Sequence, residues 1–151
     1  RVRELIGPEG RIRIDANGAW NVDEAEHAIH AMADVDLEYV EQPCASIAEL
    51  AEVRKRVKYM AIPIAADESV RKASDPFAVV EAKAADILVL KAQPLGGTRQ
   101  ALEIARRAGL PVVVSMSPVR STRRLASQWV RSWLRRCLTF RMTVGWARPH
   151  C

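Results

Sequence analysis

The sequence predicts an α/β fold in which short strands alternate with helices, and three observations support this. Five apolar segments recur along the first 115 residues, and their ends are 26, 26, 24 and 24 residues apart. Each interval contains one stretch with the apolar spacing of an amphipathic helix. The later apolar segments are nearly continuous, which is typical of parallel strands that helices cover.

The first unit begins with a strand at residues 11–15, where Ile12 and Ile14 alternate with arginines. An Asn-Gly turn follows at residues 17–18. The predicted helix over residues 22–35 then carries acids in its first turn, where they suit the positive end of the helix dipole.

The same alternation continues along the chain. The remaining strands are predicted at residues 37–41, 62–67, 86–91 and 110–115, and the remaining helices at residues 47–57, 74–85 and 98–109. Ser74 or Asp75 is expected to cap the third helix, with Pro76 in its first turn. Gly109 is expected to end the fourth.

Two folds are built from such repeated units, an open doubly wound sheet and a (β/α)8 barrel. A dinucleotide-binding doubly wound sheet has a glycine-rich phosphate turn after a strand, and the glycine pair Gly96-Gly97 lacks the third spaced glycine. A complete barrel needs about 200–250 residues, so four units and a fifth strand amount to about half of one. The sequence therefore favours a partial (β/α)8 TIM barrel.

Three acidic residues each end a successive predicted strand, namely Asp15, Glu41 and Asp67. In a barrel the carboxyl ends of the strands converge on one mouth. Three carboxylates there would repel one another unless a cation neutralised them, and oxygen ligands favour Mg²⁺ over zinc. Lys91 ends the next strand, where it suits proton transfer beside a metal. The alternative is three unrelated turn acids and a surface lysine.

The segments DANGAW, YVEQP, ADES and LKAQPLGG stand at these strand ends, and over residues 1–115 the chain resembles the enolase superfamily, muconate-lactonizing branch. DLEYVEQPC, PIAADESVR and VLKAQPLGG are most similar to the actinobacterial o-succinylbenzoate synthase family. Dipeptide epimerases, muconate cycloisomerases and N-succinylamino acid racemases share most of this framework and stay open as alternatives.

The resemblance implies that Asp15, Glu41 and Asp67 bind Mg²⁺ (or Mn²⁺), which holds a substrate carboxylate and stabilises the enediolate formed when the α-proton leaves. Lys91 matches the lysine of the family's sixth strand. In a synthase it would stabilise negative charge, and in a racemase it would be the second acid/base. The implied partner is a small-molecule carboxylate, and the implied reaction of the synthase is dehydration in menaquinone biosynthesis.

Further residues are implied around the ligands. Asn17 and Glu68 stand beside them in the sequence and are expected to support them or to line the pocket. The Gly96-Gly97 loop and Ser115, which begins the next loop, are expected to border the substrate pocket.

The resemblance also divides the chain. Residues 1–117 correspond to about strands 3 to 7 of the barrel. The family's capping domain and its principal base, in a Lys-x-Lys motif on the second strand, are expected upstream of Arg1. We therefore expect this chain to be inactive by itself.

Residues 118–151 differ in composition from the rest of the chain. Residues 1–118 carry 15 basic and 18 acidic side chains, whereas residues 119–151 carry eight arginines and no acid. We interpret this tail as a segment translated out of frame. The alternative is a cationic amphipathic helix that binds something anionic in a non-catalytic fragment.

The cysteines and the apolar segments indicate the compartment and the partners of the protein. Cys44, Cys137 and Cys151 form neither a disulfide framework nor a zinc pattern, which favours a reducing cytoplasm. The sequence has no signal-peptide pattern at its start and no apolar run of the length that spans a membrane. We expect no nucleic-acid partner and no membrane partner, and the oligomeric state stays open.

Overall fold

The strands form one parallel sheet in which each strand pairs with its neighbours in the sequence. The structure, a computed structural model, describes residues 2–115. The sheet order is β1-β2-β3-β4-β5. The strands are β1 (Ile12–Asp15), β2 (Leu37–Glu41), β3 (Ile64–Ala66), β4 (Ile87–Lys91) and β5 (Val112–Ser115). A doubly wound sheet reverses its strand order partway, so this unbroken order is that of a singly wound barrel.

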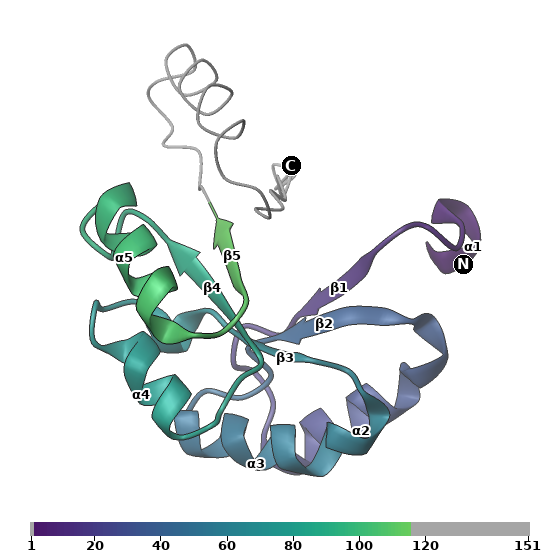
Figure 1. Ribbon diagram of the computed structural model, residues 1–151. Coiled ribbons are helices and arrows are strands. Elements are labelled where there is room, and N and C mark those ends of the chain that lie inside the picture. Colours follow the sequence, from purple (N-terminus) through teal and green to yellow (C-terminus); the bar gives the residue numbers. More distant parts are fainter. Residues whose placement is uncertain (1, 116–151) are drawn as a thin grey trace, which may run out of the picture.

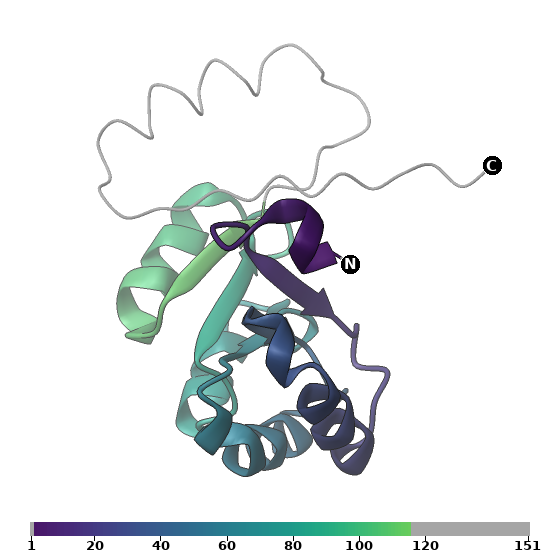
Figure 2. The ribbon, with the colours of Figure 1, turned by 90° about the vertical axis from the view of Figure 1, so that its right-hand side faces the viewer.

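The helices lie on one side of the sheet, as an arc outside the strands (Figures 1 and 2). They are α2 (Val22–Ala31), α3 (Ile47–Val57), α4 (Asp75–Glu81) and α5 (Thr98–Ala108), with the short helix α1 (Val2–Ile6) before β1. Single-turn helices η1 (Ala33–Val35), η2 (Lys58–Met60) and η3 (Glu68–Val70) complete the description. The strands and helices together form a curled half-barrel, which confirms the predicted fold class.

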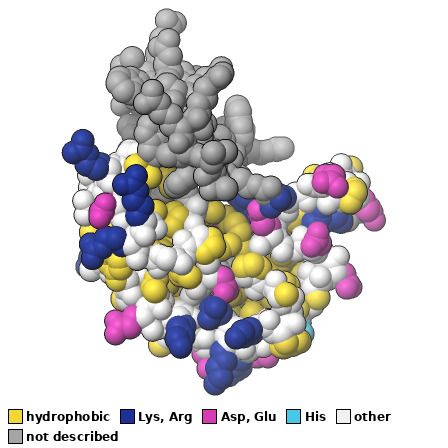
Figure 3. Space-filling view, viewed as in Figure 1, with side chains coloured by type: hydrophobic (Ala, Val, Ile, Leu, Met, Phe, Trp, Pro, Cys, Tyr) yellow, Lys and Arg dark blue, Asp and Glu magenta, His cyan; other side chains and the backbone are white. Residues whose placement is uncertain are grey.

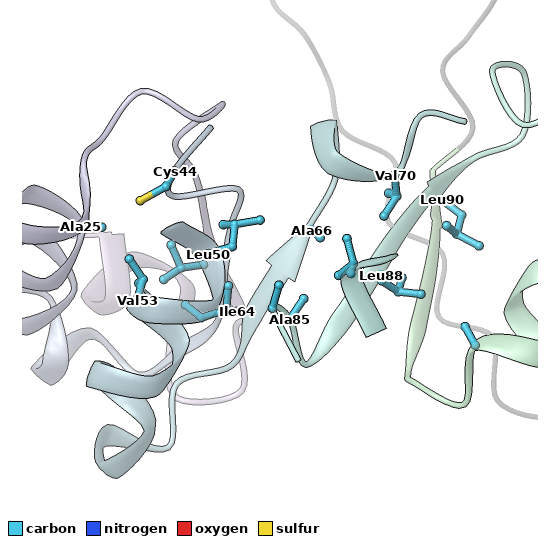
Figure 4. Packing of buried hydrophobic residues seen from close by; sticks show 14 of the residues in the cluster. Ala25, Cys44, Leu50, Val53, Ile64, Ala66, Val70, Ala85, Leu88 and Leu90 are labelled. Carbon is cyan, nitrogen blue, oxygen red and sulfur yellow. The ribbon is translucent and has the colours of Figure 1, made fainter. Parts of the chain in front are cut away.

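The main core fills the space between the sheet and the helices. Leu50 and Val53 of α3 lie near Ile64 of β3, and Leu88 of β4 belongs to the same cluster; all four side chains are fully buried (Figure 4). Burial of a side chain of this size stabilises a fold by about 1.5–3 kcal/mol, so these apolar contacts fix the strands against the helices.

The opposite face of the sheet carries a smaller cluster. Tyr39, Ala65 and Val89 are buried there, from three adjacent strands. The guanidinium of Arg13 in β1 lies 4.9 Å from the centre of the Tyr39 ring. In the space-filling view hydrophobic side chains fill much of the middle of the molecule, and Lys and Arg side chains gather over α5 and α3 (Figure 3).

Local sequence signals mark the starts of α2 and α3 and the end of α5. Asn21 and Glu24 form a reciprocal capping box at the start of α2, and Ser46 and Glu49 form another at the start of α3. Gly109 ends α5 in the left-handed conformation with a φ of 69°, as predicted.

Two predicted helices are shorter in the structure. The stretch at residues 22–35 divides at Met32 into α2 and η1, because the chain turns there and then adopts a left-handed conformation at Asp36 with a φ of 56°. The stretch at residues 74–85 ends at Glu81. Ser74 is the N-cap residue of α4 and Pro76 lies in its first turn, as predicted, although the Ser74 side chain makes no capping hydrogen bond.

The predicted basic tail, residues 118–151, lies outside the described residues. Within residues 2–115, no helix has the length and hydropathy that crossing a membrane requires.

A candidate acidic site at the carboxyl ends of the strands

The sheet register places the three predicted acids at one edge of the sheet. Asp15 and Glu41 are direct partners at the ends of β1 and β2. Glu41 pairs in turn with Ala65 of β3, and Asp67 follows that residue by two positions. Lys91 ends β4 and pairs with Ser115, the last residue of β5. Four of these residues therefore end strands and Asp67 lies one residue past the end of β3, all at the same side of the half-barrel.

Glu41 is the residue on which the electrostatics of this edge converge. Its pKa is raised from 4.5 to about 7, first by burial and then by the negative charges of Asp15 and Asp67. A hydrogen bond between the Glu41 and Asp67 side chains raises the pKa further, and the charge of Lys91 opposes the shift. Burial is the main cause of the shift, and the contributions of Asp15 and Asp67 mean that both carboxylates lie near Glu41.

Asp67 is the buried member of the group. It is 3% exposed, and its carboxylate forms an ion pair with the ammonium of Lys91, which is about a third exposed. Lys91 therefore provides the positive charge that offsets a buried carboxylate at this edge.

Asp15 is the exposed member, and it shapes its own loop. Its Oδ1 accepts a hydrogen bond from the backbone N–H of Asn17 at 2.9 Å. Asn17 adopts a left-handed conformation with a φ of 50°, and Gly18 follows with a φ of 71°. Asn17, predicted to support the site, thus contacts Asp15 through its backbone, in the turn that Asp and Asn favour.

Glu68 begins η3 directly after Asp67. Its Oε1 accepts a hydrogen bond from Arg71 at 3.2 Å. Its Oε2 is buried and has no hydrogen-bond partner among the residues that the structure describes. A buried polar atom normally has a partner, and this unpaired one belongs to the residue that directly follows Asp67 in the chain.

The glycine pair lies in the loop between β4 and α5. Gly96 and Gly97 have φ values of 88° and 113°, and an added Cβ would meet nothing within 4 Å at either position. The backbone conformation, and not lack of space, requires glycine here. Gly97 donates its N–H to the carbonyl of Ala92 at 2.7 Å, which closes the loop beside the end of β4.

Sequence reasoning missed Gln42, which follows Glu41 and is fully buried. Its side-chain oxygen accepts hydrogen bonds from the backbone N–H groups of Asp67 at 3.0 Å and Ser69 at 3.3 Å. The sequence contains one signal for Gln42: it is a polar residue between Glu41, which ends a predicted strand, and Pro43.

The donor set at this edge suits a hard divalent cation, because it consists of carboxylate oxygens held on adjacent strands. Within residues 2–115, no group of three or more His, Cys, Asp or Glu side chains is arranged to coordinate an ion. In this structure the Asp67 carboxylate is instead paired with Lys91.

The sequence of this chain is similar to those of known proteins. The family described as "Enolase C-terminal domain-like" matches residues 1–142. The o-succinylbenzoate synthase of Thermobifida fusca is 60% identical over 114 residues, which cover 76% of this chain and 35% of that protein. The chain thus spans about a third of the length of such relatives.

Solved structures agree with the family match. A dipeptide epimerase from Enterococcus faecalis V583 has a TM-score of 0.69 at 31% identity, over 77% of this chain and 34% of that one. An enolase from Bradyrhizobium complexed with magnesium and mandelic acid has a TM-score of 0.69 at 28% identity, over 78% of this chain and 33% of that one. The fold, the strand-end acids and these matches lead to one conclusion: the chain belongs to the enolase C-terminal domain-like family of the enolase superfamily.

Proposed function

We propose that this chain supplies the metal-binding half of an o-succinylbenzoate synthase barrel. The reaction removes an α-proton from a small-molecule carboxylate and then eliminates water. The observation that carries the proposal is the sheet register, which puts Asp15 opposite Glu41 at the ends of β1 and β2. Asp67 lies one residue past the end of β3 and pairs with Lys91. The 60% identity to the o-succinylbenzoate synthase of Thermobifida fusca supports this choice of reaction within the superfamily.

Asp15, Glu41 and Asp67 are the proposed ligands of Mg²⁺ or Mn²⁺. When bound, such a cation offsets the negative charge that grows on the substrate carboxylate as its α-proton leaves. A cation held by Asp67 would compete with Lys91 for that carboxylate. The ammonium of Lys91 would then be free to face the substrate.

Lys91 is proposed to stabilise the developing negative charge from the side of β4. Its side chain is accessible at the edge where the acids lie, and a positive charge in a partly desolvated site favours an anionic transition state. Asn17 shapes the Asp15 turn, and the Glu68 carboxylate and the Gly96-Gly97 loop are proposed to border the substrate, together with Ser115.

A chimera tests this proposal. The aligned 114-residue segment of this chain would replace its counterpart in the Thermobifida fusca synthase, which supplies the rest of the barrel. We expect the chimera to support growth of a menaquinone auxotroph that lacks its o-succinylbenzoate synthase, and the 151-residue chain alone to fail. Asp67→Ala and Lys91→Ala in the chimera should abolish growth, whereas Lys58→Ala, at an exposed position in η2, should not. A folded chimera that never supports growth would contradict the proposal.

Epimerisation is the second candidate, because the solved dipeptide epimerase is similar and Lys91 stands at a strand end where it can exchange a proton. In an epimerase Lys91 would both donate and remove a proton at the substrate α-carbon. Incubating the chimera with dipeptides in deuterated buffer distinguishes the two reactions. Deuterium incorporation at the α-carbon without loss of water would favour epimerisation.

A further inference from the structure

Gln42 joins three loops at the carboxyl end of the sheet through a saturated set of hydrogen bonds. Its side-chain oxygen accepts from the N–H groups of Asp67 and Ser69, at 3.0 and 3.3 Å. Its side-chain nitrogen donates to the carbonyl of Cys44 at 2.9 Å and to the hydroxyl of Ser69 at 2.7 Å. All four bonds are made by a side chain that is fully buried.

The backbone of the same residue extends these connections to the neighbouring strands. Its N–H donates to the carbonyl of Ala65 in β3 at 2.8 Å, and its carbonyl accepts from Gly18 after β1 at 2.7 Å. Gln42 adopts a φ of 38°, in the left-handed region that favours glycine. Glycine would fit this backbone better, and the four hydrogen bonds of the glutamine side chain offset that cost.

The contacts of Gln42 connect two of the proposed metal ligands. Glu41 precedes it in the chain, and Asp67 donates its backbone N–H to the Gln42 side chain. The backbone of Asp67 is therefore fixed relative to β2 by a side chain rather than by the sheet ladder, since β3 ends at Ala66.

An amide is the side chain that this position requires. It offers an oxygen acceptor to two N–H groups and a nitrogen donor to two oxygens, and it carries no charge. A carboxylate would add negative charge beside Glu41 and Asp67 and would leave the Cys44 carbonyl without a donor. A lysine would leave the Asp67 N–H without an acceptor.

We propose that Gln42 is a positioning residue that holds Asp67 beside Glu41 so that both carboxylates can bind one divalent cation. This inference rests on the proposed function, because it assumes that the strand-end acids bind the cation. It adds a residue that touches neither the cation nor the substrate and that acts through the Asp67 backbone.

The test measures Mn²⁺ binding by the 151-residue chain, from the electron paramagnetic resonance signal of the free ion. The variant is Gln42→Met, which keeps the length of the side chain and removes its hydrogen bonds. Gln42→Asn, which shortens the amide, is a second variant in case Gln42→Met does not fold. The matched control is Asp86→Leu, because Asp86 accepts the backbone N–H of Ile64 at 3.0 Å at the opposite end of β3.

We expect both Gln42 variants to weaken Mn²⁺ binding by about ten- to a hundredfold, as loss of residues that orient metal ligands does. Hydrogen–deuterium exchange without metal should become faster in residues 67–69. Asp86→Leu should speed exchange at Ile64 and change Mn²⁺ affinity less than about twofold.

Two results overturn this inference while the proposed function stands. One is that a folded Gln42 variant binds Mn²⁺ as tightly as the parent chain. The other is that Asp86→Leu weakens binding as much as the Gln42 variants, which would make the effect a general loss of stability. Absence of saturable Mn²⁺ binding by the parent chain is a separate result, and it overturns the proposed metal site and this inference together.

Discussion

The raised pKa of Glu41 makes the free energy of unfolding depend on pH, and replacing Glu41 with glutamine should remove this dependence. In the folded chain the pKa of Glu41 is about 7, compared with an ordinary value of 4.5. Between these pH values the unfolded chain has lost the proton that the folded chain still holds. Raising the pH across this window therefore lowers the free energy of unfolding of the parent chain, and the full cost is present above pH 7.

The size of this cost follows from the difference between the two pKa values. At about 1.4 kcal/mol per pKa unit, the difference corresponds to roughly 3 kcal/mol. Glu41 is half-buried, and water screens part of the repulsion, so we expect about 1–2 kcal/mol. A glutamine side chain has no proton to lose, so Glu41→Gln should gain that amount relative to the parent chain as the pH rises from about 4.5 to about 8.

The assay is urea denaturation of both chains at several pH values, in the presence of a chelator. The quantity compared is the difference in free energy of unfolding between the two chains, because the contributions of groups far from Glu41 cancel in that difference. Glu103→Gln is the control, since it removes the same charge from an exposed position of α5. A difference between parent and Glu41→Gln that stays constant across this pH range would refute the electrostatic account of this edge. Adding Mg²⁺ should stabilise the parent chain above pH 7 and leave Glu41→Gln little changed, because metal ligands bind deprotonated.

Three further substitutions test the packing around the site by urea denaturation. Leu50→Ala removes a fully buried side chain from the main core and should cost about 2–5 kcal/mol, and a cost below about 1 kcal/mol would mean that the contact between α3 and the sheet is loose. Gly18→Ala should cost about 1–2 kcal/mol, since the φ of Gly18 is 71° and the new Cβ would lie 3.2 Å from the Cα of Ala45. An unchanged urea midpoint would contradict the left-handed turn. Arg56→Ala should cost less than about 1 kcal/mol although three carboxylates surround the guanidinium, because these ion pairs are at the surface. The loss of stability should be smaller still at high salt, which screens the charges. A larger loss that does not depend on salt would contradict this.

The strand ends were the part of the structure that the sequence predicted best. Asp15, Glu41, Lys91 and Ser115 each end a strand, as predicted from the polar residue that follows each apolar run. β3 ends at Ala66, one residue before Asp67, where the sequence predicted its end. Helix boundaries were less accurate where the chain bends without glycine or proline, as at Met32 and after Glu81.

The contacts within the site could not be predicted. Nothing in the sequence tells that Lys91 pairs with Asp67 rather than with Glu41, because that choice depends on side-chain burial in three dimensions. The role of Gln42 was hidden for the same reason. Its partners include Asp67 and Ser69, which are 25 and 27 residues away in the chain and come near only when β2 and β3 pair. The helix α1 gave no amphipathic signal, since five residues are too few for one.

The unbroken strand order has a consequence for how the chain folds during synthesis. Each strand pairs with the one made about 25 residues earlier, as Asp15 does with Glu41 and Lys91 with Ser115. A strand that leaves the ribosome therefore finds its partner already present, and the sheet can grow in the direction of translation. Until the next strand arrives, the newest one offers unpaired N–H and C=O groups to any other extended chain. The growing edge is the point at which a chaperone or a second nascent chain would compete with correct folding.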